Sequence, residues 1–228
     1  MTYKKKFVWT LTSMMVAMMS VGFISCGSDD EDDVVSPIDT TPATLFVGDT
    51  KTVEGNVTAS KSENTFVASV KNNLITANHV GNTTVVINNK YNILVSVIPK
   101  YMIMTSEPVL DWGITKEELK SRWKLGTLEE KDNILAYHDC GDAALVGYSF
   151  KNGKLNSVTI AVPTSKGIKF TNYLTERFFM DPREIKDQYV GIDAYTLKDA
   201  KTSIVYDASG GYKVGSATVY LCTYMPAN

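Results

Sequence analysis

Short apolar runs separated by turn-forming residues dominate the segment from residue 41 to residue 99. In the last run Tyr91, Ile93, Val95 and Val97 alternate with other residues, which places them on one face of a strand. Gly, Asn and Asp pairs between the runs favour hairpin turns. We therefore expect a small antiparallel β-sandwich. Its strands should lie at residues 45–47, 52–57, 66–70, 74–77, 83–87 and 91–97.

Apolar residues at helical spacing first occur in the second segment, residues 101–228. Thr115 and Glu118 have the spacing of a capping box, so a helix should begin there and end by Gly126. A second helix should begin at Ser165 as its cap. The apolar stripe of that helix comprises Phe170, Tyr173, Leu174 and Phe178.

Three strands are expected after each helix. They span residues 133–138, 144–150 and 154–162, then 189–197, 202–206 and 216–223, with Gly210-Gly211 in the last hairpin. This order indicates a tandem αβββ repeat that forms one antiparallel sheet of about six strands with two helices on one face. The predicted fold class is therefore two domains, an all-β sandwich followed by an α+β domain.

The amino terminus has the parts of a secretory leader, with three lysines before an uncharged stretch at residues 7–24. Phe23-Ile24-Ser25-Cys26 resembles the lipobox of bacterial lipoproteins. In that family the leader, here residues 1–25, is removed and the cysteine, here Cys26, is lipidated. A permanent membrane helix is the alternative, since eighteen residues approach the length of a membrane span.

Five acidic residues, Asp29–Asp33, follow the lipobox and lie within an expected linker at residues 26–40. Without these acids and the leader lysines, acidic and basic residues are equal in number. Cys-Gly-Ser-Asp-Asp-Glu resembles the export signal of Bacteroidota lipoproteins displayed on the cell surface. That resemblance implies an outer-membrane, surface-exposed protein. Attachment on the periplasmic face is the alternative, in which the acids only solvate a linker. Asp39-Thr40-Thr41 also resembles an O-glycosylation acceptor of these bacteria.

Four successive motifs in residues 41–99 resemble the bacterial immunoglobulin-like group 2 domain (BIG2). They are Val47-Gly48-Asp49-Thr50, Val67-Ala68-Ser69-Val70, Leu74-Ile75-Thr76-Ala77 and Val80-Gly81-Asn82-Thr83-Thr84-Val85. The resemblance implies an immunoglobulin-like spacer or adhesion module without catalytic residues.

The outline of residues 101–228 is similar to β-lactamase-inhibitor-protein-like folds and to small outer-membrane assembly lipoproteins. This likeness is one of topology alone, and a fold does not carry a function with it. It leaves an envelope assembly factor or a protein inhibitor as an alternative function.

Charge and cysteine content bear on which ligands and which covalent bonds the chain can have. The net charge of −2 and the absence of a basic stripe outside the leader argue against nucleic-acid binding. Cys140 and Cys222 remain after lipidation, and they can form a disulfide or stay as two buried thiols. The sequence does not decide between these two states.

No catalytic, metal or cofactor site is predicted. His138, Asp139 and Cys140 are neighbours in an expected strand, so they point to alternating faces and cannot assemble a triad. Asp132, Asp139 and Asp142 lack the spacing of a calcium loop. Gly210-Gly211 lacks the features of a phosphate loop. His79 is expected in a solvated turn.

Tyrosine is the residue type that suggests binding. Nine of the twelve tyrosines lie from residue 137 onward. A tyrosine combines an apolar ring with a polar tip, which suits both a half-buried strand and a binding face. The candidate ligand-binding residues are Tyr137, Tyr148, Tyr195 and Tyr206. The sequence thus predicts a non-enzymatic lipoprotein whose second domain binds a protein or a glycan for adhesion or capture.

Overall fold

A computed structural model describes residues 37–183 and 185–227, which belong to one compact unit. The predicted leader, Cys26 and the acidic run lie outside the described residues. Within the two described ranges, no helix is long and apolar enough to cross a membrane.

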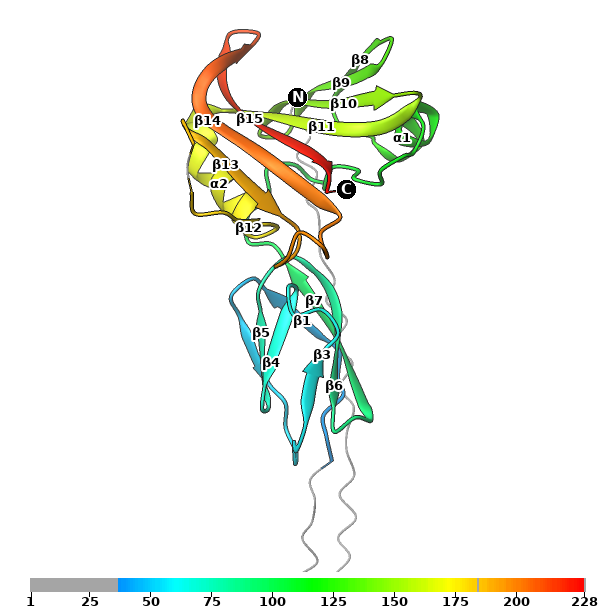
Figure 1. The fold of residues 1–228 in the computed structure, drawn as a ribbon, viewed down its shortest axis with the longest axis vertical. Coiled ribbons are helices and arrows are strands. Elements are labelled where there is room, and N and C mark those ends of the chain that lie inside the picture. The colour runs from blue at the N-terminus through cyan, green and yellow to red at the C-terminus, as the bar shows by residue number, and fades with distance from the viewer. Residues whose placement is uncertain (1–36, 184, 228) are drawn as a thin grey trace, which may run out of the picture. The chain divides into compact units, whose positions relative to one another are not determined.

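Residues 41–99 form two small sheets (Figure 1). The first has the order β1-β7-β6-β3, and the second has the order β2-β5-β4. Strand β1 pairs with β7 in parallel, whereas the other pairs are antiparallel. The strands span Ala43–Phe46 (β1), Thr50–Thr52 (β2), Ser60–Ser62 (β3), Ala68–Lys71 (β4), Leu74–Ala77 (β5), Gly81–Ile87 (β6) and Tyr91–Ile98 (β7).

One apolar core joins the two sheets. Ile93 and Val95 of β7 alternate with more exposed residues, as the sequence pattern predicts, and they pack with Ile75 of β5. Five of the six expected strands are present, most of them with shifted ends. The strand expected at residues 52–57 is not formed, because β2 ends at Thr52, and β3 is an addition. The parallel β1–β7 pair departs from the predicted antiparallel arrangement.

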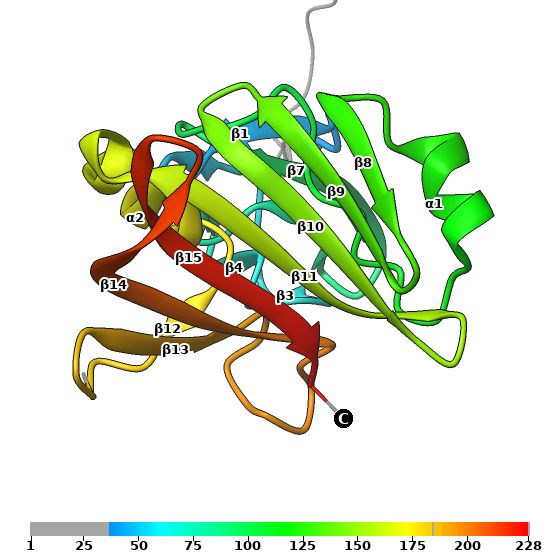
Figure 2. The same cartoon turned by 90° about the horizontal axis from the view of Figure 1, so that it is seen from above.

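Residues 101–227 contain one antiparallel eight-stranded sheet of order β12-β13-β14-β15-β11-β10-β9-β8 and two α-helices (Figure 2). The first half spans Lys116–Arg122 (α1), Thr127–Lys131 (β8), Ile134–Cys140 (β9), Ala143–Lys151 (β10) and Lys154–Pro163 (β11). A 3₁₀ turn (η1) at Thr164–Lys166 follows. The second half spans Gly167–Thr175 (α2), Phe179–Met180 (β12), Gln188–Ile192 (β13), Thr202–Val214 (β14) and Ala217–Pro226 (β15).

The predicted β-rich architecture is confirmed, but the sheet has eight strands rather than about six because β8 and β12 were not expected. Helices α1 and α2 lie near opposite ends of the sheet in Figures 1 and 2. Leu119 of α1 and Phe170 of α2 are both buried in the same core as Tyr148, Ile160 and other inward-facing strand residues.

The predicted capping box of α1 is confirmed. The Thr115 hydroxyl accepts the Glu118 N–H at 3.3 Å, and the Glu118 carboxylate accepts the Thr115 N–H at 2.7 Å. The helix ends at Arg122 rather than reaching Gly126, because Trp123 already has an extended backbone.

Two turn predictions are wrong. Ser165 does not cap α2, because it lies inside the 3₁₀ turn and the helix begins at Gly167 without a side-chain cap. Gly210-Gly211 does not form the last hairpin turn. These glycines lie inside β14, where the register with β15 shifts between Asp207 and Tyr212, and the turn lies at Gly215, whose φ is +57°.

Candidate functional site

A pocket of about 630 Å³ lies between helix α2 and strands β13, β14 and β15. This volume falls in the range of sites that bind small molecules. Side chains from α2, from the β12 segment and from three strands line it. They are Thr164, Ile168, Thr171, Asn172, Leu174, Thr175, Met180, Asp181, Pro182, Tyr189, Tyr206, Ala208 and Tyr220, together with Gly167.

Helix α2 presents an uncharged polar face to the pocket. Ile168, Thr171, Asn172 and Thr175 recur at helical spacing, so they share one side of the helix and line the pocket. The predicted apolar stripe is buried in the core with the sheet: Phe170, Tyr173, Leu174 and, beyond the helix, Phe178. Leu174 lies at the border of the two faces, because it also lines the pocket.

The helix lysines are engaged away from this face. Lys169 binds the Asp142 carboxylate at 2.6 Å, and Lys166 binds it at 3.2 Å. These two ammonium groups hold the pKa of Asp142 below its usual value. The lysines are absent from the lining of the pocket, so its helical wall carries no cation.

Three tyrosines form the opposite wall. The rings of Tyr189 and Tyr206 stack at 5.9 Å with an interplanar angle of 28°, and Tyr220 meets Tyr206 edge-on at 6.1 Å. Tyr206 is almost fully buried, and burial raises the pKa of its hydroxyl. That hydroxyl lies 3.4 Å from the Thr171 hydroxyl, which joins the tyrosine wall to the helical wall.

Two glycines make room for the Tyr220 ring. A Cβ added to Gly167 would lie 2.5 Å from Cε2 of Tyr220, which is far closer than two carbons approach. A Cβ added to Gly210 would lie 3.4 Å from Cε1 of the same ring. The backbone φ of Gly210, +66°, also favours glycine at this position. Any residue larger than glycine at position 167 would therefore clash with the Tyr220 ring.

Of the residues that the structure describes, Asp181 is the one carboxylate in the lining of the pocket. Arg183 donates to it through Nε at 2.9 Å and lowers its pKa to about 2. Because this carboxylate is already paired, the pocket offers a ligand aromatic rings, hydroxyls and an amide rather than an available charge.

The carboxyl end of α2 is held by Glu176. Its carboxylate accepts the backbone N–H groups of Lys100 and Tyr101, each at 3.0 Å, and its own carbonyl accepts the Val80 N–H at 2.8 Å. Glu176 is 6% exposed. A nearly buried carboxylate thus fixes the segment that links residues 41–99 to the helix.

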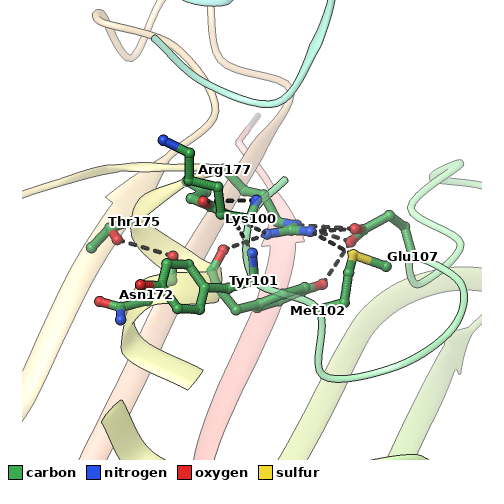
Figure 3. Close-up of polar contacts among 9 residues, drawn as sticks. Lys100, Tyr101, Met102, Glu107, Asn172, Thr175 and Arg177 are labelled. Carbon is green, nitrogen blue, oxygen red and sulfur yellow. Dashed lines mark hydrogen bonds and ion pairs between the residues drawn. The ribbon is translucent and has the colours of Figure 1, made fainter. Parts of the chain in front are cut away.

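Arg177 follows Glu176 at this end of the helix, and its guanidinium is directed toward Glu107 (Figure 3). Its Nε donates to both Glu107 oxygens at 3.0 and 3.1 Å, and Nη1 donates to the Tyr173 carbonyl at 2.8 Å. The guanidinium carbon lies 3.7 Å from the centre of the Tyr173 ring. The Tyr173 hydroxyl donates to Glu107 at 2.7 Å, and burial followed by the Glu107 charge raises the pKa of that hydroxyl.

The four tyrosines singled out from the sequence are not brought together. Only Tyr206 lines the pocket. Tyr137 and Tyr148 lie in the core, where they make edge contacts with each other and with Trp123. The Tyr148 hydroxyl accepts the Val109 N–H at 3.3 Å, and burial raises the pKa of that hydroxyl.

Tyr195 is the exposed member of the four, with 46% of its surface accessible. It makes edge contacts with Phe66 at 5.2 Å and with Phe179 at 5.8 Å. His79 also contacts it, and this histidine is not in the solvated turn that we expected. Its ring stacks on Phe66 at 3.9 Å and its Nδ1 lies 2.9 Å from the Phe66 carbonyl oxygen. Burial lowers the pKa of His79.

Tyr206 is the one pocket residue that the sequence reasoning assigned to binding, so Asn172, Tyr189 and Tyr220 are among those that it missed. For Asn172 a signal existed in the helix, where the polar residues Thr171, Asn172 and Thr175 recur at helical spacing.

The two cysteines are free, buried thiols, which decides the question that the sequence left open. Cys140 donates weakly to the Tyr137 carbonyl at 3.4 Å, and burial raises its pKa to about 11. Its neighbour His138 interacts with Glu129 at 3.1 Å. Among the residues that the structure describes, no group of three or more His, Cys, Asp and Glu residues is placed to hold a metal ion.

No protein-family model, curated protein or solved structure matches the chain.

Replacing Glu176 with Gln should loosen the linker. The amide keeps one acceptor oxygen, so one of the Lys100 and Tyr101 N–H groups loses its partner. Because bonds to charged acceptors are the stronger ones, hydrogen exchange at these amides should become roughly tenfold faster, as mass spectrometry can measure. Glu117→Gln, on the exposed face of α1, should leave them unchanged. Unaltered exchange at Lys100 and Tyr101 in Glu176→Gln would contradict the anchoring role.

Acidification should destabilise the fold through His79. Its folded pKa lies below the usual 6.5, so the unfolded chain binds more protons as the pH falls below about 6.5, and the unfolding free energy drops until the folded pKa is reached. His79→Phe keeps the ring contact and removes the titration. Denaturant unfolding at pH 7 and pH 5 should therefore show a smaller drop in His79→Phe than in the wild type, while Tyr195→Phe keeps the full drop. Equal drops in wild type and His79→Phe would refute this role.

Proposed function

We propose that this chain is a non-enzymatic, lipid-anchored binding protein whose second module, residues 101–228, takes up a ligand in the pocket between α2 and strands β13–β15. The observation that carries the proposal is the combination of three tyrosine rings with an uncharged polar helix face around about 630 Å³. Pockets of this size with a few convergent polar groups are the usual form of a binding site.

A binding role fits the chemistry of Cys140, which lies two residues after His138 in the sequence. With a pKa of about 11, the Cys140 thiol is protonated near neutral pH, and the thiolate is the nucleophilic form. We therefore assign no catalytic step to His138 and Cys140.

We further propose that residues 1–25 are removed, that Cys26 carries the lipid and that residues 26–40 form an acidic linker. The support is the lipobox and the acidic run that follows it. These features favour the outer membrane, with the protein displayed on the cell surface. Adhesion or capture of an external ligand would follow from that location.

Residues 41–99 are proposed as an immunoglobulin-like spacer of the BIG2-like kind. Two small sheets around a shared apolar core support this role, as do the four sequence motifs. Glu176 gives the spacer a fixed connection to α2, because it holds the Lys100 and Tyr101 amides.

An envelope assembly factor or a protein inhibitor is the second candidate function. A helix followed by four antiparallel strands occurs twice in the second module, an order that fits a tandem repeat and the β-lactamase-inhibitor-like outline. Gly147, Thr159 and Thr223 of the central strands point away from the core and stay half-exposed. A protein partner could cover this uncharged face of the sheet.

The proposed lipid anchor is tested by metabolic labelling with a palmitate analogue in cells that express the full chain. Wild type should be labelled, and Cys26→Ala should lose the label, whereas Cys140→Ala should keep it because that thiol is buried in the fold. Protease treatment of intact cells should then remove the labelled protein. Label that survives in Cys26→Ala would refute the lipid anchor, and full protection from protease would refute surface display.

The pocket is tested with the full chain in a detergent that has no sugar headgroup. Three kinds of probe cover the candidate ligands: an immobilised glycan panel, envelope proteins of the producing bacterium and the neutral apolar dye Nile red. Binding of at least one probe should weaken roughly tenfold in Gly167→Ala, in which the new Cβ displaces the Tyr220 ring. Tyr212→Ala, an exposed tyrosine outside the pocket, is the matched control and should bind normally.

If Gly167→Ala leaves binding intact, the binding site lies outside the pocket. Capture of an envelope protein that is lost in Thr159→Lys and kept in Gly167→Ala would support the inhibitor or assembly function instead. If no probe binds, the binding function itself fails.

A further inference from the structure

The lining of the pocket is poorly suited to a charged ligand. Among the described residues Asp181 is its one carboxylate, and Arg183 already pairs with it. Lys166 of the 3₁₀ turn and Lys169 of α2 bind Asp142, and neither lysine lines the pocket. A charged group that entered would lose its hydration without meeting an available opposite charge, which is unfavourable.

A purely apolar ligand is also a poor match. Thr171, Asn172 and Thr175 line the pocket along one side of α2. Within the described part of the chain, the Asn172 side-chain amide has no hydrogen-bonding partner, although its backbone carbonyl accepts from Thr175 and Glu176. Covering this amide with hydrocarbon would remove its contact with water and give no bond in return.

The Tyr220 ring is one apolar part of the wall, beside aliphatic side chains such as Ile168, Leu174 and Met180. It is half-buried, its position is set by Gly167 and Gly210, and it lies edge-on to Tyr206. A tyrosine ring offers a flat apolar face beside a polar tip. A ligand that complements this wall and the α2 face therefore has an apolar face and uncharged hydroxyl groups at its edge.

We propose that the pocket binds an uncharged sugar ring of a glycan, with the C–H face of the sugar against Tyr220 and its hydroxyls on the Asn172 amide and the α2 threonines. A sugar ring has axial C–H groups on one face and hydroxyls around its edge, which matches both walls. The volume of about 630 Å³ accommodates a ligand of the size of a short oligosaccharide. This inference rests on the pocket being the binding site, as proposed above.

The experiment compares neutral sugars with their uronic acid counterparts. Saturation-transfer NMR and calorimetry would be run on the full chain, in detergent without a sugar headgroup, with gluco- and galacto-oligosaccharides of three residues. Oligoglucuronate and oligogalacturonate of the same length differ from these only in their carboxylates. Nile red serves as an apolar probe of the same pocket.

Neutral trisaccharides of at least one series should bind, and their uronic acid counterparts should bind at least about tenfold more weakly. Asn172→Ala and Tyr220→Leu should each weaken neutral binding by roughly tenfold. The matched controls are Asn156→Ala on exposed strand surface and Tyr212→Leu, and both should bind as the wild type does. Unfolding midpoints would show that each variant is folded.

Equal or tighter binding of the uronic acids would overturn the inference, as would neutral binding that is insensitive to Asn172→Ala and Tyr220→Leu. Binding of Nile red that Tyr220→Leu abolishes, without binding of any trisaccharide, would overturn the sugar assignment and leave the pocket as a binding site. If neither the trisaccharides nor Nile red binds, the sugar inference fails. The proposed function fails as well only if the glycan panel and the envelope proteins described above also do not bind.

Discussion

The pair of charged residues at the end of α2, Glu176 and Arg177, is the constraint on which the rest of the second module depends. Both side chains are nearly buried, so their charges are tolerated only because each is surrounded by partners. Glu176 holds two backbone amides of the linker, while Arg177 lies between Glu107 and the face of Tyr173. Loss of either residue would leave a charge or several donors buried without a partner, which is among the most costly changes a fold can undergo.

Fixing this end of α2 also fixes the direction of its two faces. The apolar face, with Phe170 and Leu174, fills the core beneath the sheet, and the face with Thr171 and Asn172 is then directed to the pocket. Gly167 at the start of the helix lets the backbone approach Tyr220 closely. The pocket is therefore a consequence of how one short amphipathic helix is anchored at both ends, rather than of a flexible loop.

The sequence predicted those parts of the fold in which local chemistry decides the structure. The alternation in β7 and the capping box at Thr115 are local signals, and both are confirmed. Strand β8 was missed because every one of its residues is exposed, so it has no apolar alternation and exists through its pairing with β9. Tyrosine content indicated a binding surface, but only the strand register shows that Tyr148 faces the core while Tyr220 reaches the pocket. The stacking of His79 on Phe66 likewise depends on residues distant in sequence.

The central claim is that the pocket beside α2 binds a ligand. Its most direct test is to observe the tyrosines that line this pocket individually. In a full chain with ring-labelled tyrosine, NMR resonances of the twelve tyrosines would be assigned by single Tyr→Phe substitutions and followed during titration with neutral oligosaccharides. The account predicts that the Tyr189 and Tyr220 signals shift with one common affinity while Tyr91 of β7 and the exposed Tyr212 stay in place. Shifts confined to tyrosines outside the pocket would contradict it.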